Sequence, residues 1–350
     1  MNAEDFTRGL AQSPDFLWQD VDLVNRRGLV VKFAEAGYQA ASFLDHRAFK
    51  DQTVGAWLNL TDIRRSSEHL TVPAPQAIFH VSHCGSTLVS RLVAELPGCL
   101  PVRESLVILA LALEQRELPS PAARLDAAGW QGLLEAAYRS LSRVYRSGQR
   151  VLIKHTSACS NLLPDFLGRT PDSRALLLHA DLETWLAVML RGPDVRLNGR
   201  FYAQAWLKDL HAATGRTDIR LAGLDDAGMF VVNWLTGMLH FESARQAHPA
   251  RTQRLDFADL LASPAEELQK LARLFGFDPS KAAAITSGPL MQSYAKRPNE
   301  RFDAATREKE LQQSRAQFGT EIKAGMAYAE KLCKEIEVLA QLGAYFTRSR

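Results

Sequence analysis

The chain has 350 residues, of which 46% are apolar and 23% are charged, and its formal net charge at pH 7 is +3. These values are ordinary for a globular protein with a large core, so they exclude extensive disorder, and so small a positive charge gives no indication of nucleic-acid binding. The longest uncharged apolar run, residues 105–113, is far shorter than the roughly 20 residues that cross a bilayer, and we expect no membrane segment.

The N-terminal residues, the cysteines and the histidines limit the location of the protein and its metal content. The first residues, Met1-Asn-Ala-Glu-Asp-Phe-Thr-Arg, are polar and acidic, unlike a signal peptide, so we expect a cytoplasmic protein. The four cysteines are scattered without a C-x-x-C pair, which predicts reduced thiols. His211, His240 and His248 lack the spacing of a ligand pair on a helix, and we expect no metal.

Residues 1–75 are predicted to be an N-terminal extension of mixed structure, with short strands or turns at 16–19, 29–33 and 42–47. Two prolines in Thr71-Val-Pro-Ala-Pro75 end it, because proline disfavours helix and central strand alike. Beyond it, short apolar runs alternate with helical periodicity, which predicts βαβ units and a parallel sheet. The expected strands are residues 77–81, 99–103, 150–154, 174–179 and 252–257. The expected helices are one that ends near Leu96 and those at 105–115, 130–145, 160–167, 182–190, 201–213 and 229–245.

The last third of the chain is predicted to be mostly helical. Ser263-Pro-Ala-Glu-Glu has the signature of a helix start, with a Ser cap, Pro at the first helical position and acids in the first turn. We expect a core domain over residues 76–300 and a C-terminal helical segment over 301–350. The segment 307–342 is expected to cap the core, while pairing with another subunit is the alternative, so the oligomeric state stays open.

One stretch, Ala77-Ile-Phe-His-Val-Ser-His-Cys-Gly-Ser-Thr-Leu-Val-Ser-Arg91, joins a buried strand to an amphipathic helix through a short Gly/Ser/Thr loop. Backbone N–H groups at a helix N-terminus lack intrahelical partners and lie at the positive end of the helix dipole, so they bind anionic oxygens. The hydroxyls of Ser86 and Thr87 add donors. The first glycine and the lysine of the Walker pattern G-x-x-x-x-G-K-S/T are both missing. An ordinary capped strand-to-helix turn is the alternative interpretation.

This loop, His83-Cys84-Gly85-Ser86-Thr87, resembles the 5′-phosphosulfate loop of the sulfotransferase superfamily. Residues 254–277 are similar to the segment of that family in which a strand ends in a Y-E-D-L-L turn and a helix runs from Ser/Asp-Pro to F-L-G. The resemblance covers roughly residues 76–300. It implies an α/β fold, a three-layer P-loop sandwich with a central, mainly parallel sheet and helices on both faces. It also implies sulfuryl transfer from 3′-phosphoadenosine 5′-phosphosulfate to a hydroxyl or amine of a small-molecule or carbohydrate acceptor.

The same resemblance assigns roles to individual residues. The 5′-phosphate is expected at Cys84, Gly85, Ser86 and Thr87. His83 stands where the family has Lys or Arg, and with a reference pKa near ~6.5 it needs an anion beside it to stay charged at neutral pH. Lys154 occupies the place of a lysine that touches the phosphosulfate in relatives, and His155 beside it is a further candidate base. Glu104 lies where several relatives carry a proposed general base, with a helix-start acid as the alternative.

The site for the 3′-phosphate departs from the family pattern. Relatives have Arg-Asp-Pro after the corresponding strand and a Ser further along the helix, but here the strand ends in His179-Ala-Asp and the helix position is near Ala187. His179, Arg191, Lys296 and Arg297 are the candidates for the donor contacts.

Two other functions are compatible with these residues. A nucleotide-dependent kinase would use a P-loop fold, but the Walker lysine is missing and no Asp for magnesium clearly follows an apolar strand. A non-catalytic binding or scaffold protein would account for the departures at His83, His179 and Ala187. The identity of the acceptor does not follow from the sequence.

Overall fold

The computed structural model describes residues 1–49, 52–294, 297–301 and 304–348, without the side chains of 293–304. Its centre is a five-stranded sheet in the order β5-β6-β4-β7-β8, and every neighbouring pair of strands is parallel. The strands are β4 (Gln76–His80), β5 (Cys99–Arg103), β6 (Arg150–Lys154), β7 (Ala175–His179) and β8 (Thr252–Asp256). All five fall where the apolar runs predict them.

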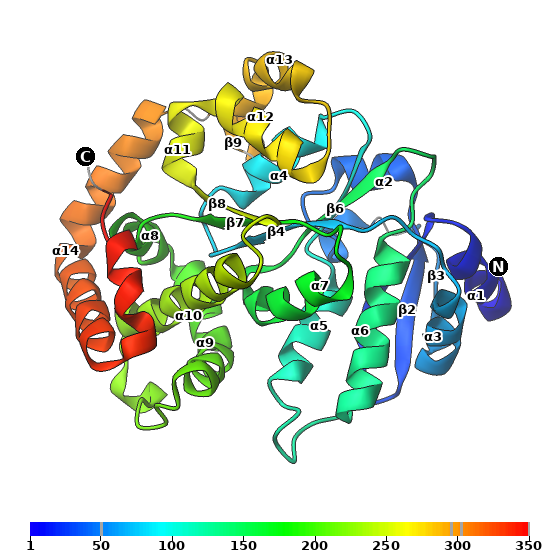
Figure 1. The fold of residues 1–350 in the computed structure, drawn as a ribbon, viewed down its shortest axis with the longest axis horizontal. Helices are drawn as coiled ribbons and strands as arrows, with labels where there is room; N and C mark the ends of the chain where they lie inside the picture. The colour runs from blue at the N-terminus through cyan, green and yellow to red at the C-terminus, as the bar shows by residue number, and fades with distance from the viewer. Residues whose placement is uncertain (50–51, 295–296, 302–303, 349–350) are drawn as a thin grey trace.

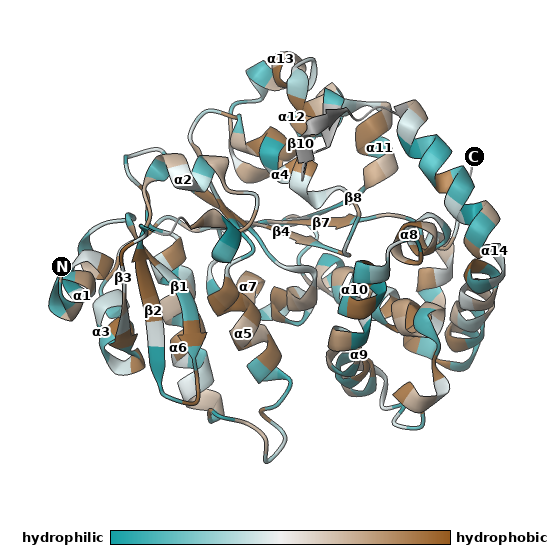
Figure 2. Cartoon of the chain, turned by 180° about the vertical axis from the view of Figure 1, so that it is seen from behind, coloured by the Kyte–Doolittle hydropathy of each residue, from teal (hydrophilic) through white to brown (hydrophobic). Residues whose placement is uncertain are grey.

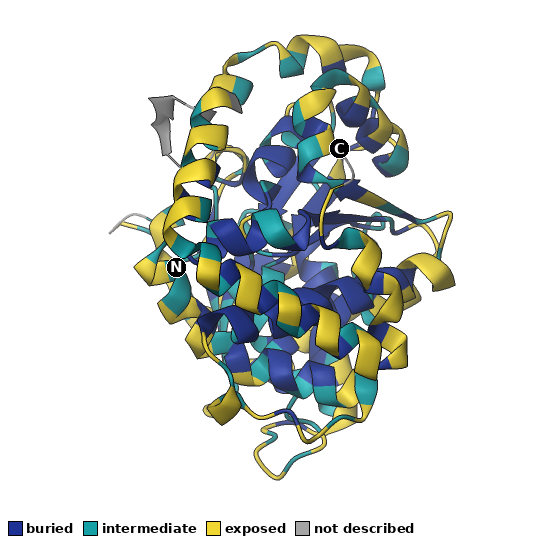
Figure 3. Ribbon diagram, turned by 90° about the vertical axis from the view of Figure 1, so that its left-hand side faces the viewer, coloured by how far each residue is buried: buried dark blue, intermediate teal, exposed yellow. Residues whose placement is uncertain are grey.

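Helices cover both faces of this sheet (Figure 1). One face carries α4 (Ser86–Ala94) and α12 (Pro264–Phe275), and the other carries α7 (Leu163–Arg169) and α10 (Asp226–Ala247). β4, β5 and β7 are buried along their whole length, because a strand between two helical layers has no solvent side. Figure 3 shows the same layering, with the sheet dark blue between helices that keep their exposed residues on the outside. The three-layer α/β prediction is confirmed.

Further helices and strands belong to the chain after residue 100. They are α5 (Leu106–Gln115), α6 (Ala127–Leu141), α8 (Leu182–Met189), α9 (Pro193–Thr214), α11 (Phe257–Ala262), α13 (Ala282–Thr286), α14 (Ala304–Glu335), β9 (Ser293–Tyr294) and β10 (Arg297–Arg301). α9 begins eight residues before the predicted Phe201, because Pro193 at its first turn starts a helix whose early positions are polar. The predicted Ser263 cap is wrong in one respect, since its side chain makes no capping hydrogen bond to α12.

The N-terminal residues are more regular than their sequence predicts. β1 (Phe16–Asp22), β2 (Arg27–Lys32) and β3 (Gly55–Asn59) form an antiparallel sheet, flanked by α1 (Ala3–Gln12), α2 (Glu35–Ala40) and α3 (Leu60–Glu68). Figure 2 shows brown, apolar residues along β2 between these helices. Only β1 and β2 were expected; residues 42–47 contain the start of a short 3₁₀ helix, His46–Ala48, and no strand.

The C-terminal helix α14 lies along the outside of the helical layer in Figure 1 and packs against α8 and α10. Arg315 on α14 pairs with Glu183 on α8 at 2.8 Å, and the Ser314 hydroxyl donates to the carbonyl of Ala187. The helix therefore covers the core of this chain. Within the described residues, no helix is both long enough and apolar enough to span a bilayer.

Candidate functional site

The carboxyl edge of the parallel sheet brings the polar candidates together. β4 runs into the loop 81–85, β5 into Glu104, and β6 and β7 end at Lys154 and His179. β4 is central, with β5 and β6 on one side and β7 and β8 on the other. In open α/β sheets a crevice forms at the carboxyl ends where the strand order reverses, so this edge is the expected place for a ligand.

The loop between β4 and α4 is a tight, closely packed turn. Gly85 has φ 79° and His83 has φ 55°, both in the left-handed region. Gly85 also lies against the ring of Phe257, and a Cβ on it would come within 2.0 Å of a ring atom. Turns that alternate right- and left-handed residues point successive backbone N–H groups into one concavity, which suits an anion. Glycine is thus required here for both conformation and space.

The loop and the start of α4 carry two hydroxyl groups, a thiol and an imidazole. Ser86 and Thr87 are buried, and the hydroxyl oxygen of Thr87 has no hydrogen-bond partner within the described part of the chain. The thiol of Cys84 donates to the carbonyl of Val81 at 2.7 Å, and burial raises its pKa, so it stays a neutral thiol. His83 is exposed at the tip of the loop. The Thr87 hydroxyl is therefore a buried polar group at the start of α4 whose hydrogen bond is not made within the described part of the chain.

Lys154 and Glu104 meet beside this loop although 50 residues separate them. The parallel register pairs Arg103 with Lys154, and the amide of Glu104 donates to the Lys154 carbonyl at 2.7 Å. Their side chains form an ion pair, with Lys154 1% exposed and the Glu104 side chain 20% exposed. The Lys154 ammonium also lies 5.5 Å from the centre of the Phe43 ring. The geometry places an ammonium and a partly accessible carboxylate side by side.

His155, the other candidate base, belongs to the core. Its ring stacks on Phe79 with a centroid distance of 4.1 Å, and Nε2 lies 3.0 Å from the Tyr138 hydroxyl. Burial lowers its pKa to about 3, so the ring is neutral at physiological pH. These contacts give His155 a packing role away from the pair formed by Lys154 and Glu104.

Arg103, at the end of β5, anchors the N-terminal extension. Its guanidinium donates to the Ser90 hydroxyl at 2.9 Å and to the carbonyls of Tyr38 and Ala41 at 3.1 and 2.7 Å. The residue is 1% exposed. Sequence reasoning gave it no such role, because its partners are backbone carbonyls about 60 residues away.

The ends of β7 and β8 carry a second cluster, rich in carboxylates. Both ring nitrogens of His179 lack hydrogen-bond partners in the described structure, and Nδ1 lies 3.8 Å from Asp256. Burial, assisted by the charge of Arg254, lowers the pKa of His179 to about 4, so the ring is uncharged at neutral pH. Asp181 and Asp256 cap α8 and α11, and burial raises the pKa of both carboxyl groups.

Arg307 on α14 and Arg348 near the C-terminus are cations whose charges act on the Asp256 carboxylate. The Arg307 guanidinium lies 5.5 Å from the centre of the Phe257 ring, and burial lowers its pKa while Asp256 and Asp181 oppose that shift. Sequence reasoning missed Arg307, Asp181 and Asp256. An Asp directly after a buried strand and before a helix was the signal available for the two acids.

Of the remaining predicted donor contacts, Arg191 is the one whose side chain the structure describes. Arg191 lies after α8, and its guanidinium pairs with Glu310 of α14 at 2.8 Å. Lys296 lies outside the described residues. Arg297 begins β10, and its side chain is not described. The described structure thus brings the loop, Lys154, Glu104 and His179 to one edge of the sheet, and it places Arg191 against α14.

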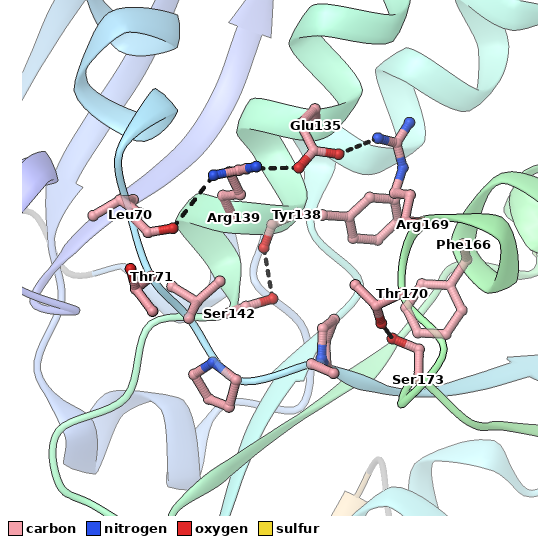
Figure 4. Close-up of a pocket in the computed structure, with 14 residues that line it drawn as sticks. Leu70, Thr71, Glu135, Tyr138, Arg139, Ser142, Phe166, Arg169, Thr170 and Ser173 are labelled. Atoms are coloured by element: carbon pink, nitrogen blue, oxygen red, sulfur yellow. Dashed lines mark hydrogen bonds and ion pairs between the residues drawn. The ribbon is translucent and has the colours of Figure 1, made fainter.

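Two hollows lie outside this loop. The first, of about 310 Å³, is at the opposite, amino edge of the sheet, between residues 70–75, α6, α7 and Ser173. Figure 4 shows that Glu135, at the rim of this hollow, forms ion pairs with Arg139 and Arg169. The pair with Arg139 has a length of 2.6 Å. The second, of about 580 Å³, lies between β1, β3, α5 and α9. We call the second hollow the α5–α9 cleft. No group of three or more His, Cys, Asp or Glu in the described residues is arranged to hold a metal.

Comparison with known proteins gives structural neighbours only. No protein-family model matches the chain, and neither does any curated protein. The sulfotransferase domain of the curacin biosynthetic pathway is 13% identical, with a TM-score of 0.42 over 71% of this chain and 98% of that one. A sulfotransferase from Mycobacterium tuberculosis is 13% identical, with a TM-score of 0.40 over 72% and 82%. The sulfotransferase domain of a Synechococcus olefin synthase is 14% identical, with a TM-score of 0.38 over 72% and 96%.

Proposed function

We propose that this chain transfers a sulfuryl group from 3′-phosphoadenosine 5′-phosphosulfate to a hydroxyl or amine of an acceptor. The observation that carries the proposal is the buried, unpartnered Thr87 hydroxyl, in a left-handed loop at the start of α4, beside the pair formed by Lys154 and Glu104. In the reaction the acceptor oxygen or nitrogen attacks sulfur, the bond from sulfur to the bridging oxygen breaks, and adenosine 3′,5′-bisphosphate leaves.

The loop supplies the donors for the 5′-phosphate in this proposal. The amide of Val89 donates to the carbonyl of Gly85 at 3.1 Å and closes the first turn of α4, so the amides before it lie at the open end of the helix. The hydroxyls of Ser86 and Thr87 complete the set. Backbone donors at a helix N-terminus hold a phosphate without a lysine in the loop, which is consistent with the missing Walker lysine.

Lys154 and Glu104 divide the chemistry. The Lys154 ammonium neutralises charge that develops on the bridging oxygen as the bond to sulfur breaks, and a fixed, desolvated charge is most effective there. Glu104 accepts the proton that the acceptor loses, which its partial exposure permits. The pair separates in the loaded site, because the two groups then face different parts of the reactants.

The charges at the ends of β7 and β8 are unfavourable for a polyanionic donor. Asp181 and Asp256 oppose a polyanion, and His179 is uncharged at neutral pH. In this proposal Arg307, together with the nearby Arg254 and Arg348, supplies positive charge to the donor. The carboxylates and the neutral His179 are the observations that favour the alternative of a binding protein without transferase activity.

Calorimetry with adenosine 3′,5′-bisphosphate tests the proposal. We expect binding that does not require magnesium, and about tenfold weaker binding by Thr87→Val, which keeps the shape and removes the donor. Thr7→Val on α1, whose hydroxyl only donates to the Ala3 carbonyl, is the matched control and binds normally. Preference for ATP with magnesium would favour a kinase. No binding of either nucleotide would leave the non-catalytic function.

Transfer itself is tested by the release of adenosine 3′,5′-bisphosphate from the donor in the presence of an alcohol. Glu104→Gln and Lys154→Met are expected to abolish this release while the variants still bind the bisphosphate through the loop. Undiminished release by Glu104→Gln would remove Glu104 as the base.

A further inference from the structure

The α5–α9 cleft gathers exposed apolar side chains that a folded surface usually avoids clustering. Seven large hydrophobic residues are exposed in the described part of the chain, and three of them, Val24, Trp57 and Phe201, line this one hollow. Phe201 is 76% exposed, and Leu197, 68% exposed, lies one helical turn before it on α9. Exposed apolar residues that converge on one concavity mark a binding site for an apolar group.

The charges of the cleft select against an anion. Its two arginines are both engaged: Arg116 is held by Asp209 at 2.6 Å, and Arg124 lies 3.5 Å from Glu114. The lining also carries the carboxylates of Asp20, Asp22 and Glu117. Asp22 pairs with Arg27 at 3.1 Å and Glu117 pairs with Lys208 at 2.6 Å, so among the described residues Asp20 is the lining carboxylate without an ion pair. An anionic ligand would meet the unpaired Asp20 carboxylate and no uncommitted arginine, whereas an alcohol or an amine meets no such repulsion.

The position of the cleft relates it to Glu104. α5 begins two residues after Glu104, and Ala110 is the first residue of α5 in the cleft lining. Four helical residues at about 1.5 Å each, and two non-helical residues that each span up to about 3.5 Å, place the near end of the cleft at most about 13 Å from Glu104 along the chain. Tyr202, which lines the cleft from α9, has a pKa raised by burial, and the Glu104 carboxylate contributes to that shift. The Glu104 carboxylate is therefore close enough to the α5–α9 cleft to influence Tyr202, although it does not line the cleft.

We propose that the α5–α9 cleft binds the apolar chain of an extended alcohol or amine whose reactive end reaches Glu104 over at most about 13 Å. The N-terminal sheet then forms one wall of the acceptor site, through Trp57 on β3 and the turn after β1. The identification of this ligand as an acceptor rests on the proposed function. The preference of the cleft for uncharged or cationic ligands with a long apolar chain is independent of that function.

Three probes of equal chain length test this preference by calorimetry on the full chain without any donor: decanol, decylamine and decanoate. We expect decanol and decylamine to bind, and decanoate to bind at least about tenfold more weakly because of the carboxylates. Propanol is too short to fill the cleft and should not bind measurably. Decanoate binding as tightly as decanol would overturn the proposal.

Two variants locate the binding. Phe201→Ser and Trp57→Ser are each expected to weaken decanol binding about tenfold, since each removes a large apolar contact from opposite walls. Both residues are exposed, so their replacement leaves the core intact. Val338→Ser, at an apolar residue 45% exposed outside the cleft lining, is the matched control and binds decanol normally. Unchanged decanol affinity in Phe201→Ser would refute the assignment.

The two proposals fail separately. If adenosine 3′,5′-bisphosphate does not bind while the decanol series behaves as expected, the transferase function falls and the apolar cleft stands. If the bisphosphate binds and the decanol series shows no charge preference, the cleft falls and the transferase function stands.

Discussion

Replacing Gly85 by alanine should destabilise the protein through two separable effects. Gly85 has φ 79°, and an L-residue with a Cβ in this region costs about 1–2 kcal/mol. The new Cβ would also lie 2.0, 2.3 and 2.4 Å from three ring atoms of Phe257, which is itself 7% exposed. Forcing a ring aside in a packed site costs about 1–3 kcal/mol more. The expected total loss in the free energy of unfolding is about 2–5 kcal/mol.

The chain offers a matched control for the backbone part. Gly215 ends α9 with φ 70°, and a Cβ there would meet nothing within 4 Å. Gly215→Ala should therefore show only the conformational cost of about 1–2 kcal/mol. Urea denaturation of both variants measures the difference, which isolates the contact with Phe257.

A double-mutant cycle makes the argument refutable. In a Phe257→Ala background the ring is gone, so Gly85→Ala should cost no more than Gly215→Ala does in the wild type. Equal costs for Gly85→Ala and Gly215→Ala in the wild type, or a Gly85→Ala cost that persists without the ring, would contradict the close approach described here.

Three further predictions concern stability. Because the folded-state pKa of His179 lies at about 4, below the reference 6.5, the unfolded chain takes up the proton first as pH falls. Stability from this residue is therefore lost between pH 6.5 and 4, by about 3 kcal/mol at about 1.4 kcal/mol per pH unit, and His179→Phe should flatten that part of the curve relative to the wild type. Arg103→Met should cost about 3–5 kcal/mol in urea denaturation, because several buried acceptors lose their donor, and should expose residues 38–44 to limited proteolysis; unaltered proteolysis would show that other contacts hold this segment. Ser263→Ala should leave the thermal stability nearly unchanged, because the Ser263 side chain makes no capping hydrogen bond. Asp126→Ala should cost about 1 kcal/mol, because Asp126 accepts a capping hydrogen bond from the Gly129 amide at 2.7 Å. Equal effects of the two substitutions would contradict this cap assignment.

Local pattern decided much of the fold before any tertiary contact is considered. The bounds of β5 and β6 coincide with the apolar runs 99–103 and 150–154, because strands buried between two layers are continuously apolar. The loop at Gly85 follows from the strand-to-helix transition and from a residue that tolerates a left-handed backbone. By contrast, β3, α1 and α3 have short or mixed patterns, and they form because long-range pairing and packing override weak local preference.

The candidate site shows the same division. The order of strands and helices along the chain is enough to predict which polar residues end the strands, since the parallel alternation places Glu104, Lys154 and His179 at one edge of the sheet. The three-dimensional fold was needed to see that Glu104 and Lys154 pair, that His179 is neutral, and that Phe201 and Trp57 share one cleft. Ion pairing, protonation and cavity shape depend on how close segments far apart in the chain come to one another and on how deeply they are buried. A local sequence pattern contains no information about these distances or about this burial.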